Sequence, residues 1–360
     1  MEIYENRQYL EDVSYVAEQK LPWKKLQDQS VMISGATGLV GSFLVDVLMD
    51  RNRNYGMNCT VYALGRNAER AKRRFAYCAD EKTWKYISYD INRPLVREDI
   101  GKVDYILHLA SNTHPFAYST DPIGTITTNI IGTQNMLEFA AAHGAERCVF
   151  TSSNEIYGEN RGDVEKFDEE YCGYIDCNTM RAGYPESKRC GEALCQAYIR
   201  QKGLDIVIPR LTRSYGPTLL ATDTKALTQF IRKGVAGEDI VLKSRGTQYY
   251  SYLYAADTVS GLLTVLLKGE CGEAYNVADD ASDIMLKDLA GIIAEYVGRK
   301  VVFEIPDAVE SAGYSKATKA RLESAKLQTL GWKAKYDIRT GIERTIDILR
   351  ALDTSGKSAG

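Results

Sequence analysis

The most regular pattern in the chain is a short apolar run that leads through a glycine-rich turn into an amphipathic segment. Residues 31–33 (Val-Met-Ile) are typical of a short buried strand, and from Leu39 onward apolar side chains recur at helical spacing. Between them, Gly35, Gly38 and Gly41 stand three residues apart. Glycines allow a tight turn close to a pyrophosphate, and the helix start offers free N–H groups to the anion. The sequence predicts a dinucleotide-binding unit, against the alternative of a turn that binds nothing.

From residue 31 onward, apolar strands alternate with amphipathic helices. The expected strands are residues 60–64, 85–88, 104–109, 147–152 and 205–209. The expected helices include residues 126–142 and 186–202. Strict βα alternation is typical of a parallel sheet covered on both faces, with ligands at the carboxyl ends of its strands. We therefore predict an α/β fold with a Rossmann-type doubly wound parallel sheet.

After Pro217 the elements become shorter and mixed. They are expected at residues 225–235, 240–242, 249–254, 257–267, 274–277, 285–297, 301–305 and 338–349. We predict an NAD(P)-binding Rossmann domain formed by residues 28–214 plus about 245–272. A smaller mixed α/β substrate-binding lobe would comprise residues 215–244 plus 273–350. Residues 1–27 are expected to form a helical arm, packed on the outside of the fold or on a partner subunit, and residues 351–360 a flexible tail.

The composition is that of an ordinary globular protein. The 360 residues suffice for one large or two modest domains, and a net charge of −3 gives no sign of nucleic acid or a membrane as partner. Without a signal peptide or a bilayer-spanning apolar run, a cytoplasmic protein is expected. The eight cysteines include no Cys-x-x-Cys pair, so we expect reduced thiols and no metal site. The side chains considered and rejected as zinc ligands are Cys172, Cys177, Cys190, Cys195, His108, His114 and His143.

A tyrosine and a lysine four residues apart form the first candidate for chemistry. Tyr184 and Lys188 would share one face of a helix. A neighbouring ammonium favours the phenolate and lowers the pKa of the tyrosine, which makes the phenolate a usable general base near neutral pH. The alternative is an ordinary surface pair.

The segment Thr151-Ser-Ser-Asn-Glu-Ile-Tyr-Gly158 follows a predicted strand, upstream of Tyr184. Its position at the carboxyl end of that strand is where an α/β sheet places catalytic groups. With the glycine turn and the Tyr184/Lys188 pair, it makes three motifs in order.

These motifs resemble the extended short-chain dehydrogenase/reductase superfamily, in particular the NAD-dependent epimerase/dehydratase family that acts on nucleotide sugars. The resemblance runs from about residue 29 to residue 350. Further matching pieces are Asp90-Ile91, His108 to Ser111, Thr128 to Thr133, Arg210 to Pro217 and Leu330-Gly331-Trp332.

The resemblance implies roles for individual residues. Tyr184 would take a proton from a sugar hydroxyl, usually at C4, while hydride passes to the nicotinamide. Lys188 would hold the nicotinamide ribose and keep Tyr184 ionised, and Ser153 would hydrogen-bond the reacting oxygen. His108 would be a structural residue of its strand. The expected cofactor-binding residues are Gly35, Ala36, Thr37, Gly38, Leu39, Val40, Gly41, Arg66, Asp90, Ile91, Leu109, Ala110, Ser111, Thr113, Asn129, Tyr184, Lys188, Arg210 and Thr212.

Glu155 and Asn154 bear on the outcome of the reaction. Sugar dehydratases and UDP-glucuronate decarboxylases carry an acidic residue where Glu155 stands, whereas simple epimerases tend to have small residues after the serine. In the dehydratases this glutamate can remove the C5 proton; the alternative is a solvated loop carboxylate. Asn154 stands where dTDP-glucose dehydratases have an aspartic acid that protonates the departing hydroxyl, which an amide cannot do. Decarboxylases and GDP-mannose dehydratases have serine there, so a lyase stays open.

The expected substrate-binding residues depart from the family pattern. Arg213 stands where an asparagine usually touches the substrate, and Tyr250 where an arginine usually grips the nucleotide diphosphate. Arg213 or Arg245 could supply that charge, because arginine pairs well with phosphate.

The cofactor remains open between NAD and NADP. NAD sites place an acid at the end of the second strand for the ribose 2′-hydroxyl. Here residues 64–67 read Leu-Gly-Arg-Asn. Arg66 suits a 2′-phosphate and hence NADP, or it could stack on the adenine of NAD.

We predict a nucleotide-sugar modifying enzyme that oxidises C4 transiently with bound NAD(P)+ and then dehydrates or decarboxylates its substrate. The alternatives are a 4-epimerase, an NADP-dependent reductase of a nucleotide-linked carbonyl compound or sugar, and a non-catalytic dinucleotide sensor, against which Tyr184, Lys188 and Ser153 argue. By resemblance a homodimer is expected, with the apolar faces of residues 126–142 and 186–202 as its interface, although these faces could be core.

Overall fold

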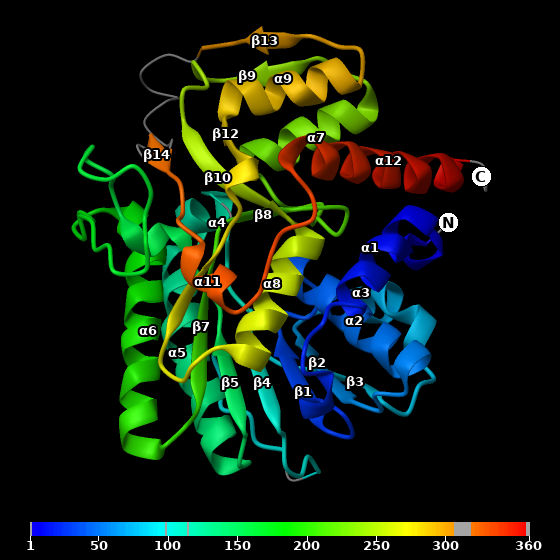
Figure 1. Cartoon of the computed structure of the whole chain (residues 1–360), viewed down its shortest axis with the longest axis vertical. Helices are drawn as coiled ribbons and strands as arrows, with labels where there is room; N and C mark the ends of the chain where they lie inside the picture. Colours follow the sequence, from blue (N-terminus) through cyan, green and yellow to red (C-terminus); the bar gives the residue numbers. More distant parts are fainter. Residues whose placement is uncertain (1, 98, 114, 306–317, 358–360) are drawn as a thin grey trace.

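The computed structural model describes residues 2–97, 99–113, 115–305 and 318–357. Eight strands of this part form one sheet, in the order β11-β7-β5-β4-β1-β2-β3, with β6 beside β7 (Figure 1). All the pairings within it are parallel. Its strands are β1 (Ser30–Ser34), β2 (Thr60–Gly65), β3 (Trp84–Ser88), β4 (Tyr105–His108), β5 (Arg147–Phe150), β6 (Ser152–Ser153), β7 (Ile206–Leu211) and β11 (Ala274–Val277). The predicted Rossmann-type parallel sheet is confirmed.

Alternating side chains of the strands fill a separate core on each face of the sheet. Met32 and Ile106 point to the face covered by the helices α5 and α6, and Val31 and Leu107 to the face covered by α1, α2 and α8. The bounds of these helices are α1 (Arg7–Ala17), α2 (Leu39–Tyr55), α5 (Pro122–Ala142), α6 (Gly183–Lys202) and α8 (Ala255–Lys268). Both faces are buried because helices connect the strands on both sides.

The sheet has its topological switch at β1, which lies between β4 and β2. Helices connected on opposite sides of this point leave a crevice at the carboxyl ends of the strands. Smaller elements lie along the same part of the chain: α3 (Ala68–Arg74), α4 (Pro115–Thr120), and the 3-10 turns η1 (Ile3–Glu5), η2 (Trp23–Lys25), η3 (Ala76–Cys78), η4 (Asn154–Tyr157), η5 (Met180–Ala182) and η6 (Asp280–Ser282).

Most of the remaining elements form a smaller group, drawn above the main sheet in Figure 1, whereas α11 packs beside β11 of the main sheet. In this group β10 pairs with β8, β12 and β14, and β9 pairs with β13. Their bounds are β8 (Arg213–Tyr215), β9 (Ile240–Leu242), β10 (Tyr249–Tyr254), β12 (Asp283–Met285), β13 (Val301–Phe303), β14 (Lys319–Ala320), α7 (Ala226–Ala236), α9 (Leu286–Tyr296), α11 (Ala325–Thr329) and α12 (Ile338–Lys357).

The pairing of two strands, β10 and β11, differs from the grouping that the predicted domain ranges imply. Residues 249–254 were assigned to the Rossmann part, but β10 pairs outside the main sheet, and β11, assigned to the smaller lobe, extends the main sheet beside β7. The reason is that β10 is held between β8 and β12, whereas α8 crosses back and delivers β11 to the main sheet. The division into domains otherwise stays a prediction.

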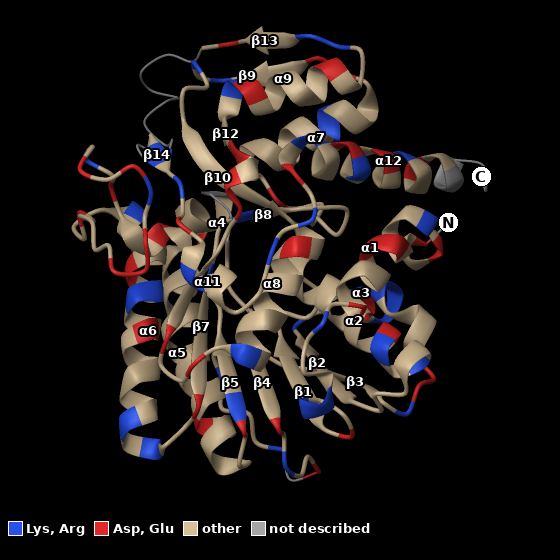
Figure 2. Ribbon diagram, viewed as in Figure 1, with Lys and Arg blue, Asp and Glu red and all other residues tan. Residues whose placement is uncertain are grey.

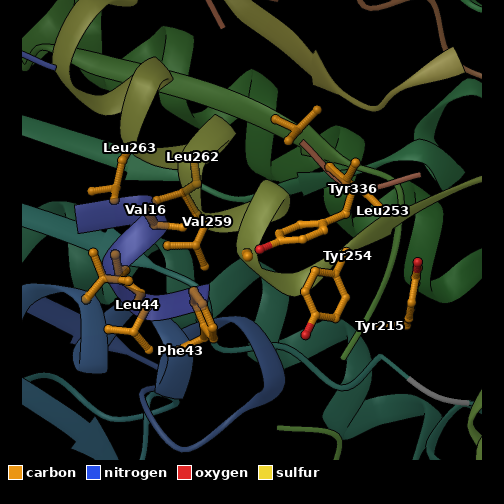
Figure 3. Close-up of a cluster of buried hydrophobic side chains, with 14 of the residues drawn as sticks. Val16, Phe43, Leu44, Tyr215, Leu253, Tyr254, Val259, Leu262, Leu263 and Tyr336 are labelled. Carbon is orange, nitrogen blue, oxygen red and sulfur yellow. The ribbon is translucent and has the colours of Figure 1, made fainter. Parts of the chain in front are cut away.

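The N-terminal helix α1 packs on its own chain. Figure 3 shows Val16 among side chains of α2 and α8, such as Leu44 and Leu262. The buried Asp12 accepts hydrogen bonds from the hydroxyls of Tyr254 and Tyr336 at 2.6 and 2.7 Å. The N-terminal arm was expected to pack either on the outside of the fold or on a partner subunit. The described contacts of α1 are with its own fold.

The last helix is longer than predicted. α12 continues to Lys357, through most of the segment expected as a tail, and residues 358–360 lie outside the described part. It continues because Leu352 still packs on the core and Arg350 donates to the carbonyl of Gly234 at 2.8 Å.

Basic and acidic residues are interspersed along the ribbon in Figure 2. Within the described ranges, no helix is long and apolar enough to cross a bilayer.

Candidate active site

The glycine turn after β1 is packed too closely for side chains. Gly35 has φ of 72°, and a Cβ added to it would lie 2.8 Å from the backbone nitrogen of Ala110. A Cβ on Gly41 would lie 2.3 Å from the carbonyl oxygen of Gly35. Helix α2 begins at Leu39, and its N-cap Gly38 has no side chain to bond the first N–H groups. These groups face the crevice of the sheet, so the turn fits the pyrophosphate of a dinucleotide.

The loop after β4 is fixed to this turn through Ser34. Its hydroxyl accepts hydrogen bonds from the backbone nitrogens of Leu109 and Ala110, both at 3.2 Å. His108 binds Ser34 through Nδ1 at 2.8 Å and Thr133 through Nε2 at 3.1 Å. Burial and the charge of Lys188 lower the pKa of His108 to about 3, so the ring is neutral. His108 is therefore a structural link.

Two arginines lie near the end of β2, next to the glycine turn. Arg66 is exposed just after β2. Arg70, which the sequence interpretation missed, donates to the carbonyl of Thr37 at 2.7 Å. Ala36 is fully buried and the carbonyl of Leu39 accepts from the hydroxyl of Thr218, while Val40 is half-buried.

Asp90 and Ile91 follow β3 at the side of α5. Oδ1 of Asp90 accepts from the backbone nitrogen of Asn92 at 3.1 Å, and Ile91 is buried. A Cβ on Gly132 of α5 would lie 2.8 Å from Cγ1 of Ile91, so this helix can approach only because residue 132 is glycine. Thr113 is exposed on the loop after β4.

Ser153, Tyr184 and Lys188 come together at the carboxyl edge of the sheet. Ser153 ends β6, and Tyr184 and Lys188 lie on the first turns of α6. All three are buried, so the alternative of a surface tyrosine–lysine pair is wrong. The ammonium of Lys188 donates to the carbonyl of Thr151 at 2.8 Å and lies 4.9 Å from the ring centroid of Phe150.

The pKa of Tyr184 differs from the expectation. Burial and the negative charge of Glu155 raise the pKa of Tyr184 well above its usual value, while hydrogen bonds with Ser153 and Ser111 and the charge of Arg181 lower it. The predicted lowering by a neighbouring lysine is outweighed. Burial also lowers the pKa of Lys188 to about 8.

Asn129 ties three elements together. Its amide oxygen accepts from the hydroxyl of Ser111 at 2.7 Å, and its amide nitrogen donates to Ser187 at 2.8 Å. Ser187 in turn donates to the carbonyl of Tyr184 at 2.8 Å. The side chain of Asn129, expected at the cofactor, thus links α5 to the β4 loop and to α6.

Glu155 is paired with an arginine that the sequence interpretation missed. Nη2 of Arg181 lies 2.9 Å from Oε1 and 2.8 Å from Oε2 of Glu155. The guanidinium carbon of Arg181 lies 4.9 Å from the ring centroid of Tyr118, which stacks on Tyr184 with centroids 5.0 Å apart. The available signal was that Arg181 stands one turn before Tyr184. Asn154 is buried next to Glu155.

Two residues expected to bind the cofactor, Arg210 and Thr212, make their hydrogen bonds to other groups of the protein. Arg210 donates to both carboxylate oxygens of Glu192 at 3.0 and 2.7 Å, and to the hydroxyl of Tyr157 and the carbonyl of Glu169. Thr212 donates to the carbonyl of Ser251 at 2.8 Å. Both side chains are buried, which favours a structural role for them over cofactor contact.

Arg213 and Tyr250 lie against each other where β8 meets β10. The guanidinium carbon of Arg213 is 3.6 Å from the ring centroid of Tyr250. Nη1 of Arg213 is buried, and among the described residues it has no hydrogen-bond partner. Arg245 is exposed on the loop after β9. Of the two arginines expected to meet a diphosphate, Arg213 is the one held in place.

In the described part of the chain, no group of three or more His, Cys, Asp or Glu side chains is arranged to hold a metal ion. His114, considered as a ligand, falls outside the described residues.

A parallel Rossmann sheet with a glycine turn after its first strand and a buried serine–tyrosine–lysine cluster defines the class of the extended short-chain dehydrogenases/reductases. The chain belongs to the NAD dependent epimerase/dehydratase family, whose family model matches residues 31–278. The resemblance of the motifs is thereby confirmed.

Relatives and solved structures extend this likeness over nearly the whole chain. UDP-glucuronic acid decarboxylase 5 of Arabidopsis thaliana is 32% identical over 312 residues, 87% of this chain and 86% of the relative. UDP-glucuronic acid decarboxylase 1 of Xenopus tropicalis is 32% identical over 323 residues, 89% of this chain and 72% of the relative. A dTDP-glucose 4,6-dehydratase of Streptomyces venezuelae, solved with NAD, has the same fold, with a TM-score of 0.77, 23% identity and coverage of 91% of this chain and 98% of that one.

Proposed function

We propose that the chain converts UDP-glucuronate into a UDP-pentose by transient oxidation at C4 and loss of carbon dioxide. The observation that carries the proposal is the carboxylate of Glu155, held two residues after Ser153 and in the same cluster as Tyr184. The names of the 32% identical relatives support this substrate. Dehydration of the dTDP-glucose type is disfavoured because the amide of Asn154 cannot donate a proton as an acid to a departing hydroxyl.

Ser153, Tyr184 and Lys188 carry the first half of the reaction. The hydroxyl of Ser153 holds the C4 oxygen, the phenolate of Tyr184 takes its proton, and Lys188 holds the nicotinamide ribose. A nicotinamide held by Lys188 would supply the acceptor for the C4 hydride and the source for its later return. Because burial raises the pKa of Tyr184, its hydrogen bonds with Ser153 and Ser111 help the phenol to give up its proton.

Glu155 serves the second half. A ketone at C4 makes the substrate a β-keto acid, and the bond between C5 and its carboxyl group breaks because the electron pair can move onto the ketone oxygen. Carbon dioxide leaves, and C5 of the resulting enolate takes up a proton from water, which the carboxylate of Glu155 would relay. If the carboxyl group stayed in place, return of hydride to the other face of C4 would give the 4-epimer, which is the alternative outcome.

We assign the nucleotide diphosphate to Arg213. Its guanidinium is stacked on Tyr250 and has a buried N–H group without a partner in the described ranges, which favours an anion at this place. Arg213 on β8 would thus supply the positive charge that the family usually takes from an arginine at the position of Tyr250 on β10.

We further propose that the dinucleotide site accepts NADP as well as the NAD named by the family description. Arg66 and Arg70 bring positive charge to the end of β2, where an NAD-selective site would carry an acid. Arg66 is the exposed one of the two and is free to reach a 2′-phosphate.

A homodimer stays a proposal, with α5 and α6 at the interface. Apolar side chains exposed on or near these helices include Ile123, Ile126, Ile131 and Met180, with exposed fractions of 75, 37, 40 and 69%. A second copy of the chain would cover them.

Mass spectrometry of products tests the proposed function. Purified protein would be incubated with UDP-glucuronate, UDP-glucose, dTDP-glucose and GDP-mannose in parallel. We expect conversion of UDP-glucuronate alone, to a UDP-pentose with release of carbon dioxide and no net consumption of cofactor. Formation of a keto-deoxy sugar, of an isomer of unchanged mass, or of product only with stoichiometric NADPH would contradict it.

A further inference from the structure

A chain of three side chains from separate segments lies beside Tyr184. Arg181 comes from η5, Glu155 from η4 and Tyr118 from α4. Arg181 pairs with the carboxylate of Glu155 on one side and lies over the ring of Tyr118 on the other. The ring of Tyr118 stacks on that of Tyr184 at an interplanar angle of 29°. The Arg181 guanidinium thus connects Glu155, assigned to C5, through the ring of Tyr118 with Tyr184, assigned to C4.

We propose that Arg181 is a positioning residue, which holds the Glu155 carboxylate toward C5 and offsets its charge so that a glutamate and a phenolate can work in one site. The inference rests on the proposed function, because it concerns how the two halves of that reaction share one pocket. Two negative groups in the same buried cluster disfavour each other's ionisation. A fixed cation paired with the carboxylate offsets part of this conflict.

The electrostatics of the cluster agree with this arrangement. The charge of Glu155 raises the pKa of both Tyr184 and Tyr118, and the charge of Arg181 lowers both. The other titratable groups of the cluster are Asp223, which raises the pKa of Tyr118, and Lys188, whose ammonium is bonded to the carbonyl of Thr151. Glu155 in turn raises the pKa of the Arg181 guanidinium, so the arginine stays charged.

The geometry also explains why an arginine is needed here. Nη2 reaches both oxygens of Glu155, while the planar guanidinium lies over an aromatic ring. A lysine could supply the charge but not this flat contact. The side chain of Arg181 is 44% exposed and that of Glu155 is 23% exposed, so the pair stands at the open side of the cluster.

The test is a double-mutant cycle of Arg181→Gln and Glu155→Gln, with Arg181→Lys as the charge-preserving variant and Arg200→Gln, on the exposed face of α6, as a matched surface control. For each protein, kcat/KM with UDP-glucuronate would be measured against pH, and the reduction of bound cofactor followed separately. We expect Arg181→Gln to lower turnover about 10- to 100-fold, within the ~10²–10⁴-fold typical of proton transfer by a positioned group.

The pH profile separates positioning from a merely structural role. Activity rises with pH as Tyr184 ionises, and loss of Arg181 raises the pKa of that phenol, so the acidic limb should move to higher pH in Arg181→Gln and return toward wild type in Arg181→Lys. In the Glu155→Gln background, where the reduction of bound cofactor is the readout, the same substitution should move the limb less, because the direct effect of the Arg181 charge on Tyr184 remains but no carboxylate is left to be held and offset. A limb that does not move, or equal effects in both backgrounds, would overturn the proposal. A wild-type protein that neither reduces its cofactor nor turns over with UDP-glucuronate would instead refute the proposed function.

Discussion

Tyr184 and Lys188 are buried four residues apart on α6, yet they are held by different partners. The ammonium of Lys188 is bonded to a backbone carbonyl, whereas the phenol of Tyr184 is surrounded by Ser153, Ser111 and the ring of Tyr118. The ionisation of the phenol therefore depends on these hydrogen bonds and on the charges of Glu155 and Arg181, and Lys188 would act as a fixed cation next to the proposed nicotinamide site.

The first prediction concerns the phenol of Tyr184. Tyr184→Phe removes the proton acceptor and keeps the ring that stacks on Tyr118, so the fold and cofactor affinity should persist while turnover falls by ~10²–10⁴-fold. Circular dichroism, calorimetric binding of NAD and product formation would be measured on the same sample. Turnover close to that of the wild type would show that another group takes the C4 proton.

The second prediction concerns the adenosine end of the dinucleotide. Arg66→Ala should weaken the binding of NADP more than that of NAD, because only NADP presents a 2′-phosphate to the guanidinium. Calorimetric titration with both nucleotides measures the difference. Equal losses for the two nucleotides would identify Arg66 as a support for adenine instead.

At this scale the sequence predicts residues better than their contacts. The spacing of Tyr184 and Lys188 and the place of Ser153 after a strand were sufficient to expect one site. Arg181 was missed because its pairing with Glu155 depends on how the long loop between η4 and η5 returns to the sheet, which no local pattern encodes. The internal partners of Arg210 were not predicted for the same reason, since Glu192 and Tyr157, which bind its guanidinium, come from other elements.

At the scale of elements, α8 joins the two parts of the molecule. Its Asp257 is buried and accepts hydrogen bonds from the backbone nitrogens of Lys335 and Tyr336, both at 2.9 Å, and from the hydroxyl of Tyr15 at 3.1 Å. One carboxylate thus fixes α1, α8 and the segment that leads into α12.

The third prediction is a pH dependence of stability from Asp257. Burial raises the pKa of Asp257 to about 6 from an ordinary value of 3.8. Since folding favours its protonated form, the stabilisation from this group is complete below the ordinary pKa and is lost as pH rises through the folded pKa. The free energy of unfolding, wild type minus Asp257→Asn, should therefore fall between about pH 4 and about pH 7.

Urea unfolding of both proteins across this pH range measures that difference. A difference that stays constant, or that grows with pH, would show that the folded state favours the ionised carboxylate.

The elements themselves follow from their periodicity, but their pairing does not. The apolar runs of β1, β2 and β4 lie within a few residues of the predicted ranges. The tyrosine-rich β10 was predicted at its observed residues, but its pairing with β8, β12 and β14 was not, because a strand buried on both faces carries no mark of its neighbours. The α12 extension was missed because its last turns are polar apart from Leu352.

At the scale of the whole molecule, the site lies at the carboxyl edge of one sheet, and the second group of strands supplies Arg213 and Tyr250 beside it. The Rossmann part would hold the dinucleotide and oxidise C4, and the β8–β10 junction would hold the diphosphate. The choice among lyase, epimerase and reductase then depends on what happens at C5, where Glu155 is assigned.

The measurement that addresses this most directly is the reaction with UDP-glucuronate in deuterated water, analysed by mass spectrometry and NMR, with Glu155→Gln as the comparison. We predict a UDP-pentose that carries one solvent deuterium at C5, no accumulation of reduced cofactor, and in Glu155→Gln a reduced cofactor that persists because the second half stalls. A product that keeps its carboxyl group and contains no solvent deuterium, formed equally well by Glu155→Gln, would contradict the account and leave a 4-epimerase in its place.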